Sequence, residues 1–402
     1  MKAVMYGGGN IGRGFIGALL SASGYAVTFV DVAKPVVDGL NTRGSYPVRI
    51  VSSAGHEDTL VTGVNAVDGG DTPAVAAAIA GADIMATAVG VNVLKFIIPN
   101  LLAGIRQRMA QNGGPLNIII CENLMDANKV LEGMLKAELS AGECAWFDEN
   151  IGLVEASIGR MVPVQTPEMQ DGDPLRVCVE RYGFLPADRD AFKGPIPAIK
   201  NLVPASPFDF YLKRKLYVHN MGHATCAYLG LYTGKDTIWQ SVDDADTLVI
   251  VQNAMQESAR ALAKKYTMPL DGLMLHIEDL LHRFTNRALG DTCLRVGGDT
   301  VRKLAPADRM LGSLATCLEQ GVTPAYIPVG VAGALYWHLQ EKALPQTVEN
   351  AAAALEQIGQ LAPGKTFDAL LALYELYRSG APLADLRRAG ETLRAEQADD
   401  IV

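Results

Sequence analysis

Four short, mostly apolar runs in the first third of the chain are each the length of one strand. They cover residues 2–6, 26–30, 84–89 and 116–121. Runs without a polar face are typical of parallel strands that crossover helices bury on both sides. Between the first two runs, Phe15, Ile16, Leu19 and Leu20 form the apolar face of a helix that ends at Gly24. This alternation predicts a doubly wound parallel sheet.

The pattern loosens after Ile151 and becomes mostly helical from Ser206. One extra strand is expected within residues 176–182. The run 206–209, Ser-Pro-Phe-Asp, predicts a helix start, because Ser can cap, Pro suits the first turn and Asp lies near the positive end of the dipole. Gly230 is the predicted stop of that helix.

Further helices are predicted later in the chain. Leu248, Val251, Met255, Ala259 and Leu262 recur at helical spacing before Pro269, and the alanines of 351–354 are expected in a helix. A domain boundary is predicted near residue 200, within the proline-bearing stretch 194–207. The fold class is therefore a Rossmann-type α/β domain with extra strands over residues 1–200, followed by a mainly α-helical substrate domain over residues 201–402.

A glycine-rich turn directly follows the first predicted strand. Gly7, Gly9 and Gly12 fit the G-x-G-x-x-G pattern, in which the glycines allow a tight turn, an approach to a pyrophosphate and close helix–sheet packing. Asp31 follows the second strand, where it would bind the adenosine ribose and repel a 2′-phosphate. NAD is therefore favoured over NADP, although Lys34 lies nearby. The predicted cofactor-binding residues are Gly7, Gly8, Gly9, Asn10, Ile11, Gly12, Arg13, Asp31, Val89 and Gly90.

A second candidate site lies in the helical half. Lys215, Asn220 and His223 form a K-x4-N-x2-H arrangement, which on an α-helix falls within an arc of roughly 140°. A buried lysine can exchange a proton with an alcohol or ketone, and Asn220 can donate to the developing oxyanion. The alternative is a solvated basic run with a satisfied core histidine. Asn123, just after the strand at 116–121, is either a second oxyanion donor or a turn residue.

Composition narrows the possible partners. The net charge of −9 disfavours nucleic acid and anionic membranes, and no apolar stretch reaches the roughly 20 residues that span a bilayer. The chain start shows no signal peptide, and the six scattered cysteines are expected to be reduced thiols of a cytoplasmic protein. Their spacing predicts no metal site. The oligomeric state does not follow from the sequence.

Five segments together resemble the polyol-specific long-chain dehydrogenases. They are residues 7–17, 87–90, 121–123, 215–223 and 302–304. The resemblance implies a metal-independent, NAD-linked interconversion of D-mannitol 1-phosphate and D-fructose 6-phosphate, in a cleft between a Rossmann domain and a helical domain. It implies that Lys215 is the general acid/base, that Asn123 and Asn220 stabilise the oxyanion, and that His223 positions substrate and lysine.

Three points stay open. Gly159 stands where the family usually has an acid, for which Glu155 or a water could compensate. Substrate phosphate is assigned to the basic residues Arg295, Arg302, Lys303 and Arg309, with surface charge as the alternative. The lack of an N-terminal extension favours the phosphate-specific branch over a dehydrogenase of unphosphorylated mannitol or arabinitol, or a hexuronate reductase. A non-catalytic NAD sensor and a zinc alcohol dehydrogenase are the more distant rivals.

Overall fold

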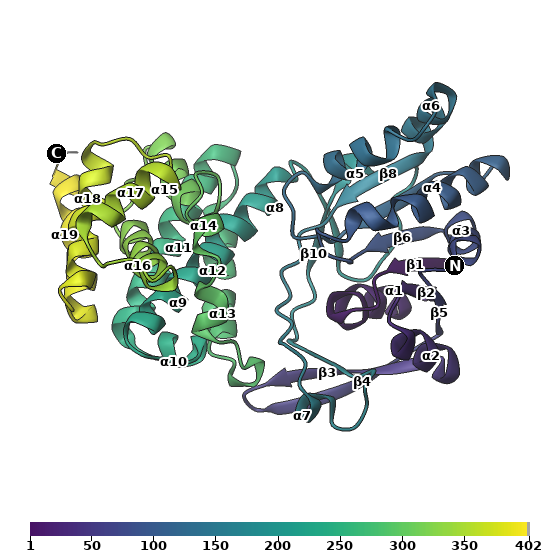
Figure 1. Ribbon diagram of the computed structural model, residues 1–402, viewed down its shortest axis with the longest axis horizontal. Coiled ribbons are helices and arrows are strands. Elements are labelled where there is room, and N and C mark those ends of the chain that lie inside the picture. Colours follow the sequence, from purple (N-terminus) through teal and green to yellow (C-terminus); the bar gives the residue numbers. More distant parts are fainter. Residues whose placement is uncertain (400–402) are drawn as a thin grey trace. The chain divides into compact units, whose positions relative to one another are not determined.

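A computed structural model describes residues 1–399. Contacts within the chain divide it into two units, Met1–Asp209 and the residues from Phe210 onward. Figure 1 labels the elements of both.

The first unit is built on a six-stranded sheet whose strands are all parallel. In spatial order they are β5 (Val64–Asp68), β2 (Ala26–Asp31), β1 (Lys2–Tyr6), β6 (Ile84–Thr87), β7 (Leu116–Ile120) and β8 (Ile151–Glu155). The order reverses between β1 and β6, so the sheet consists of two three-stranded halves, as in doubly wound folds. The predicted doubly wound sheet is confirmed, and all four predicted strands belong to it.

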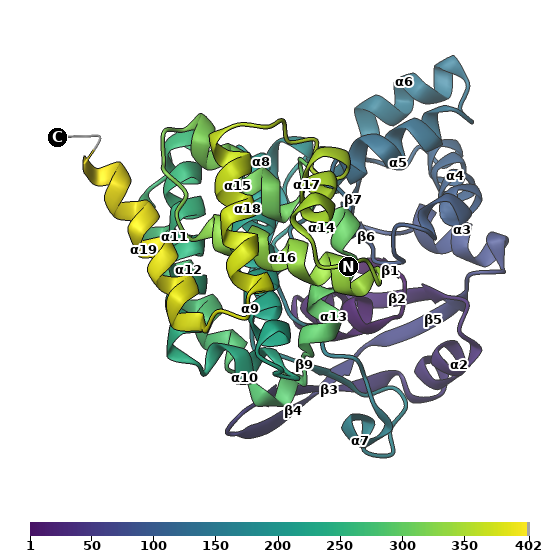
Figure 2. The ribbon, with the colours of Figure 1, turned by 60° about the vertical axis from the view of Figure 1, so that its left-hand side comes forward.

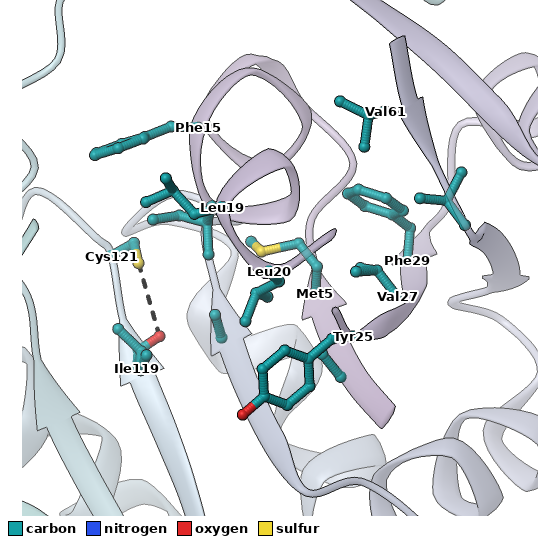
Figure 3. Close-up of a cluster of buried hydrophobic side chains, with 14 of the residues drawn as sticks. Met5, Phe15, Leu19, Leu20, Tyr25, Val27, Phe29, Val61, Ile119 and Cys121 are labelled. Carbon is teal, nitrogen blue, oxygen red and sulfur yellow. Dashed lines mark hydrogen bonds between the residues drawn. The ribbon is translucent and has the colours of Figure 1, made fainter. Parts of the chain in front are cut away.

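Alternation along each strand explains why these runs are apolar throughout. In β1, Ala3 and Met5 belong to one buried hydrophobic cluster, whereas Val4 and Tyr6 belong to another. Because successive side chains of a strand point to opposite faces, the two clusters lie on the two faces of the sheet. Figure 3 shows the first cluster, in which Met5 lies near Phe29 and residues of the glycine-loop helix.

Helices cover both faces of this sheet. The helical elements of the first unit are η1 (Gly12–Gly17), α1 (Ala18–Ala22), α2 (Lys34–Arg43), α3 (Thr72–Ala80), α4 (Leu94–Ala110), α5 (Ala127–Lys136), α6 (Ala141–Asn150), α7 (Pro167–Gln170) and η2 (Arg189–Ala191). η1 and α1 supply Phe15, Ile16 and Leu19 to the first cluster, and α3, α4 and α5 supply the second.

Two small sheets are added to the Rossmann core. The hairpin β3 (Ser45–Ser52) and β4 (Gly55–Thr62) pairs with β9 (Val177–Val179), and β10 (Leu185–Asp188) pairs with β11 (Leu202–Ala205). β9 confirms the extra strand expected within residues 176–182. The hairpin was not recognised in the sequence, because β4 is exposed at seven of its eight positions and has no apolar face to detect.

The second unit is helical, and α8 (Asp209–Lys213) leads into it. Its elements are η3 (Arg214–Asn220), α9 (Met221–Tyr232), α10 (Ile238–Val242), α11 (Ala245–Tyr266), α12 (Leu270–Phe284), η4 (Arg287–Leu289), α13 (Cys293–Gly297), α14 (Thr300–Lys303), α15 (Arg309–Glu319), α16 (Ile327–Glu341), α17 (Val348–Gln357), α18 (Lys365–Arg378) and α19 (Leu383–Asp399). The apolar α16 packs against α9 and α18 (Figure 2). The helices predicted before Pro269 and at residues 351–354 are confirmed as α11 and α17.

Two predicted helix ends are wrong. The helix begins at Asp209 rather than after Ser206, whose hydroxyl donates to Asp190 Oδ2 at 2.5 Å instead of capping. Gly230 does not end α9, which continues to Tyr232. A Cβ on Gly230 would lie 2.6 Å from Cys293 Sγ, so this glycine lets a neighbouring segment approach the helix.

We predict that Gly230→Ala destabilises the second unit. Overpacking costs about 1 to 3 kcal/mol, which outweighs the gain in helix propensity of up to about 1 kcal/mol. The matched control is Gly133→Ala in α5, where the new Cβ would meet no atom of the described residues within 4 Å, apart from its chain neighbours and the backbone of its own helix. Thermal unfolding followed by circular dichroism should show a lower Tm for the first variant and an unchanged or higher Tm for the second. A Tm for Gly230→Ala at or above that of the wild type would contradict the packing argument.

Candidate active site

The three glycines of the turn after β1 differ in their surroundings. Gly7 and Gly12 lie against other backbone atoms, whereas the space beside Gly9 is open. Gly7 has φ +102°, and a Cβ there would lie 2.4 Å from the Ala88 carbonyl oxygen. A Cβ on Gly12 would lie 1.9 Å from the Gly7 oxygen. At Gly9, by contrast, a Cβ would meet no atom of the described residues within 4 Å, apart from its two chain neighbours. The open position is the one where a pyrophosphate is expected to approach.

The helix that follows the turn is unusual, because Gly12–Gly17 has π-helical hydrogen bonding. Asn10 and Ile11 form its first turn, and Gly9 and Asn10 are exposed. Its N-terminal amides thus begin at the open side of the glycine turn, which suits an anionic ligand. Wider π-helical turns occur frequently at functional sites.

Asp31, the last residue of β2, holds the glycine turn through its carboxylate. Oδ2 accepts a hydrogen bond from Gly8 N at 2.6 Å, and Oδ1 accepts one from Ala33 N at 2.8 Å. Lys34, which weakens the expectation of NAD over NADP, forms an ion pair with Asp38 at 2.9 Å. Asp31 therefore holds the backbone of the glycine turn, and its binding of the adenosine ribose stays a prediction.

Arg13 supports the same turn from the protein side. Its side chain is buried, Nε donates to the Gly8 carbonyl at 2.6 Å, and a terminal nitrogen donates to the Leu175 carbonyl at 2.5 Å. Burial lowers the pKa of this guanidinium. The Tyr46 hydroxyl donates to the Arg13 carbonyl at 2.8 Å, which links the β3 strand to the helix start. The contacts of Arg13 are thus with carbonyl groups of the protein.

The loops after β6 and β7 meet at Glu122. This buried carboxylate accepts from Thr87 Oγ1 at 2.7 Å and from Val89 N at 3.0 Å. Gly90 next to it has φ +90°, a conformation that favours glycine. Asn123, the predicted oxyanion donor, directly follows Glu122. The side chain of Glu122 therefore connects the loop of Asn123 with the loop of the predicted cofactor residues Val89 and Gly90. The sequence motif contained Glu122, but spacing alone assigned it no role.

The resemblance implies an acid at position 159, where this chain has Gly159, and Glu155 is a residue that could compensate. Glu155 ends β8 and accepts from Ala127 N at 2.7 Å, at the start of α5. A Cβ on Gly159 would lie 2.9 Å from the Tyr182 ring and 3.2 Å from its hydroxyl. Tyr182 therefore occupies the space into which an acidic side chain at position 159 would extend.

The helical stretch that carries the second candidate site also contains a π-helical segment. Lys215 and Asn220 lie in η3, and His223 lies in the first turn of α9. The predicted arc of roughly 140° assumed α-helical spacing, so that value is wrong between Lys215 and Asn220 because π-helical turns are wider. All three side chains are partly exposed, whereas Tyr217 and Val218 between them are buried.

The residues beside Lys215 do not form a purely solvated basic run. Lys213 Nζ lies 3.2 Å from the Tyr217 hydroxyl and 4.9 Å from its ring centroid. The Arg214 guanidinium lies 4.9 Å from the centroid of the Tyr211 ring. Both neighbouring cations therefore pack on aromatic rings of the same helical stretch.

His223 has two neighbours that spacing could not identify. Its ring stacks on Phe284, with centroids 4.8 Å apart and an interplanar angle of 16°. Its Nε2 lies 3.1 Å from Asp291 Oδ2, within ion-pair distance. Burial raises the pKa of Asp291, but His223 and Arg295 outweigh burial and lower it overall. Asp291 lies 68 positions from His223, so only the fold brings them together.

The four basic residues predicted to hold a phosphate have partners of their own. Arg295 pairs with Asp291, Arg302 with Asp299 and Asp308, and Arg309 with Asp308. Lys303 is buried and donates to the Gly298 carbonyl, and burial together with Arg309 and Arg302 lowers its pKa to about 8. The cluster is therefore largely charge-compensated, with Lys303 as its buried member.

Neither a metal site nor a membrane-spanning helix occurs among the described residues. Among the side chains that the structure describes, those of residues 1–395, no three of His, Cys, Asp or Glu are grouped so that they could hold a metal ion. In the same range, no helix is both long and apolar enough to cross a membrane. All six cysteines are thiols, and five of them are buried.

A Rossmann dinucleotide-binding unit followed by a largely helical unit defines a two-domain dehydrogenase. Residues 1–201 match the mannitol dehydrogenase Rossmann domain, and residues 208–386 match the mannitol dehydrogenase C-terminal domain. The chain therefore belongs to the mannitol dehydrogenase family, which confirms the resemblance found in its motifs.

A named relative agrees with this assignment, and two solved structures share the fold. The chain is 37% identical over 359 residues to the mannitol-1-phosphate 5-dehydrogenase of Brevibacillus brevis, a match that covers 89% of this chain and 91% of that protein. A D-sorbitol dehydrogenase in substrate-free form shares the fold with a TM-score of 0.81 and 16% identity, over 96% of this chain and 94% of that one. So does Pseudomonas fluorescens mannitol 2-dehydrogenase, solved as a ternary complex with NAD and D-mannitol, with a TM-score of 0.74 and 14% identity over 96% and 93%.

We predict that Lys303 makes the stability of the protein depend on pH in the alkaline range. Its pKa is about 8 in the folded state and 10.5 ordinarily, so the unfolded chain binds more protons between these values. Deprotonation of Lys303 should therefore make the free energy of unfolding rise with pH between about pH 8 and 10.5. Lys303→Met should remove this contribution. The measurement is urea unfolding at several pH values, with the exposed Lys342→Met as control. Parallel stability curves for wild type and Lys303→Met would show that the lysine is not perturbed.

Proposed function

We propose that this protein is an NAD-dependent, metal-independent dehydrogenase that interconverts D-mannitol 1-phosphate and D-fructose 6-phosphate. The observation that carries the proposal is the 37% identity to a mannitol-1-phosphate 5-dehydrogenase, which extends over about nine-tenths of both chains. The D-sorbitol dehydrogenase and the mannitol 2-dehydrogenase share the fold at only 16% and 14% identity. Fold alone does not assign a substrate.

The first unit offers groups that fit NAD. The open position at Gly9 and the exposed helix start at Asn10 suit the pyrophosphate, and Asp31 at the end of β2 suits the adenosine ribose. The Asp31 carboxylate uses each oxygen for one backbone amide, and each oxygen can accept a further hydrogen bond. Bound NAD would supply a hydride acceptor, and NADH a hydride donor.

The residues of the chain would manage the proton and the oxyanion. Oxidation of the alcohol needs a base for the hydroxyl proton, and reduction of the ketone needs an acid for the carbonyl oxygen. We assign this exchange to Lys215. Asn123 and Asn220 would donate hydrogen bonds to the developing oxyanion. His223, stacked on Phe284 and close to Asp291, would orient the substrate and the lysine.

The substrate phosphate is assigned to the basic residues of 295–309. Lys303 and the arginines are paired with aspartates or a carbonyl, so a phosphate would have to share these donors or displace an acidic partner. Arginine remains suited to that exchange, because its fork keeps donors available after one carboxylate has bound.

We predict a large preference for the phosphorylated ketose. With NADH, D-fructose 6-phosphate should be reduced with a kcat/KM at least about 10³-fold higher than that of D-fructose, because D-fructose lacks the phosphate oxygens that the basic residues of 295–309 would bind. The measurement is NADH oxidation with a panel that includes D-fructose, a hexuronate and NADPH, with and without a chelator. Comparable rates with D-fructose, or activity abolished by the chelator, would refute this assignment.

We predict that Lys215→Ala lowers kcat by at least about 10²-fold, as expected for loss of a general acid/base, while NADH still binds. The matched control is Lys213→Ala, which removes a cation from the same helical stretch, where it contacts Tyr217. Steady-state rates give kcat, and quenching of protein fluorescence gives the NADH affinity. Unchanged turnover in Lys215→Ala would exclude this lysine from the reaction.

A further inference from the structure

Glu122 is a buried carboxylate that joins two loops at the carboxyl edge of the sheet. Only 7% of its surface is exposed. One oxygen accepts from the Thr87 hydroxyl at 2.7 Å, and the other accepts from the Val89 backbone amide at 3.0 Å. β6 and β7 are paired by backbone hydrogen bonds as far as Thr87 and Ile120. Beyond that point, the side chain of Glu122 connects the two loops that follow these strands.

Carboxylate chemistry suits this position better than an amide. The Val89 amide can only donate, and the Thr87 hydroxyl donates to the second oxygen of the carboxylate. Glutamine could keep both contacts only by turning its NH2 group to the Thr87 hydroxyl, and both hydrogen bonds would then lose the strength that the carboxylate charge gives them. Burial raises the pKa of Glu122, while the Thr87 hydroxyl and the amides of Val89, Glu122 and Cys121 act in the opposite direction. Burying an acid is costly unless hydrogen bonds compensate it, and the donors around Glu122 provide this compensation.

The loop that begins at Cys121 is anchored at its other end as well. Asp126 has φ +52° and makes no side-chain capping bond to α5. The first amide of α5, from Ala127, donates instead to Glu155 Oε1 at 2.7 Å. Glu155 ends β8, the strand next to β7, and is also buried. The segment Cys121–Asp126 is therefore held by one carboxylate from within and by a second from the neighbouring strand.

We propose that Glu122 and Glu155 are positioning residues, which hold the Cys121–Asp126 loop so that the amide of Asn123 keeps a fixed direction. Glu122 sets where the loop leaves β7, and Glu155 sets where it enters α5. Neither residue touches the reacting atoms. The inference rests on the proposed role of Asn123 as an oxyanion donor. A misplacement of about 1 Å is enough to weaken such a donor strongly, since its hydrogen bond must match the oxyanion position.

A double-mutant cycle between Glu122 and Asn123 tests the proposal. Glu122→Gln keeps the size of the side chain and should lower kcat about tenfold at saturating NADH and ketose. Asn123→Ala should lower kcat about 10²-fold. If Glu122 acts through Asn123, Glu122→Gln should cost less than about twofold in the Asn123→Ala background. The NADH affinity of Glu122→Gln should stay within about threefold of the wild type.

Two further variants separate positioning from general stability. Thr87→Val removes one of the two hydrogen bonds to Glu122 and should give a smaller loss of kcat, also absent in the Asn123→Ala background. If Glu122→Gln does not fold, Thr87→Val provides the same test. The control is Glu257→Gln in the second unit, another buried glutamate that accepts from the backbone amides of Tyr326 and Ile327. Its kcat per folded molecule should match the wild type.

The outcomes distinguish this inference from the function on which it rests. Equal losses for Glu122→Gln in both backgrounds would overturn the positioning role while leaving Asn123 in the reaction. A loss confined to NADH affinity, with normal kcat, would place the effect in the coenzyme loop and overturn it too. An Asn123→Ala variant with wild-type kcat would overturn the role of Asn123 itself.

Discussion

The carboxyl edge of a parallel sheet that is buried on both faces leaves backbone amides of the outgoing loops in need of acceptors. In this protein, acidic side chains at strand ends meet that need. Asp31 at the end of β2 accepts from Gly8 and Ala33, Glu122 after β7 accepts from Val89, and Glu155 at the end of β8 accepts from Ala127. The same edge is where such folds bind their ligands. The contacts that satisfy the backbone thus also shape the proposed coenzyme and oxyanion sites.

In the second unit, the recurring contact is the pairing of basic side chains with acidic ones. Its cluster of basic residues is matched by aspartates, and the buried Lys303 donates to a backbone carbonyl. Asp291 contacts both His223 and Arg295, so it connects the proposed substrate-positioning histidine with a proposed phosphate ligand. Isolated charges would be costly in such a partly buried place. The pairing explains how several cations can be accommodated in this unit.

Local pattern was sufficient for some elements and misleading for others. The central strands β1, β2, β6 and β7 were detected because burial on both faces makes them apolar throughout. The exposed strand β4 has no such signal. Gly230 was misread as a helix end, since sequence alone cannot show that Cys293 packs against it. The same limit applies to Ser206, whose hydroxyl meets Asp190 rather than the helix start.

The amino-acid sequence by itself determined the doubly wound sheet, the glycine turn that opens it and the residue types available for proton transfer, because periodicity and short motifs are properties of neighbouring residues. Only the tertiary structure decided that Glu122 spans two loops, that Glu155 caps α5 and that Asp291 lies beside His223. It also decided that the stretch with Lys215 and Asn220 takes a π-helical turn. These features depend on contacts between distant segments, whose geometry is set by the packing of the whole unit and not by local spacing.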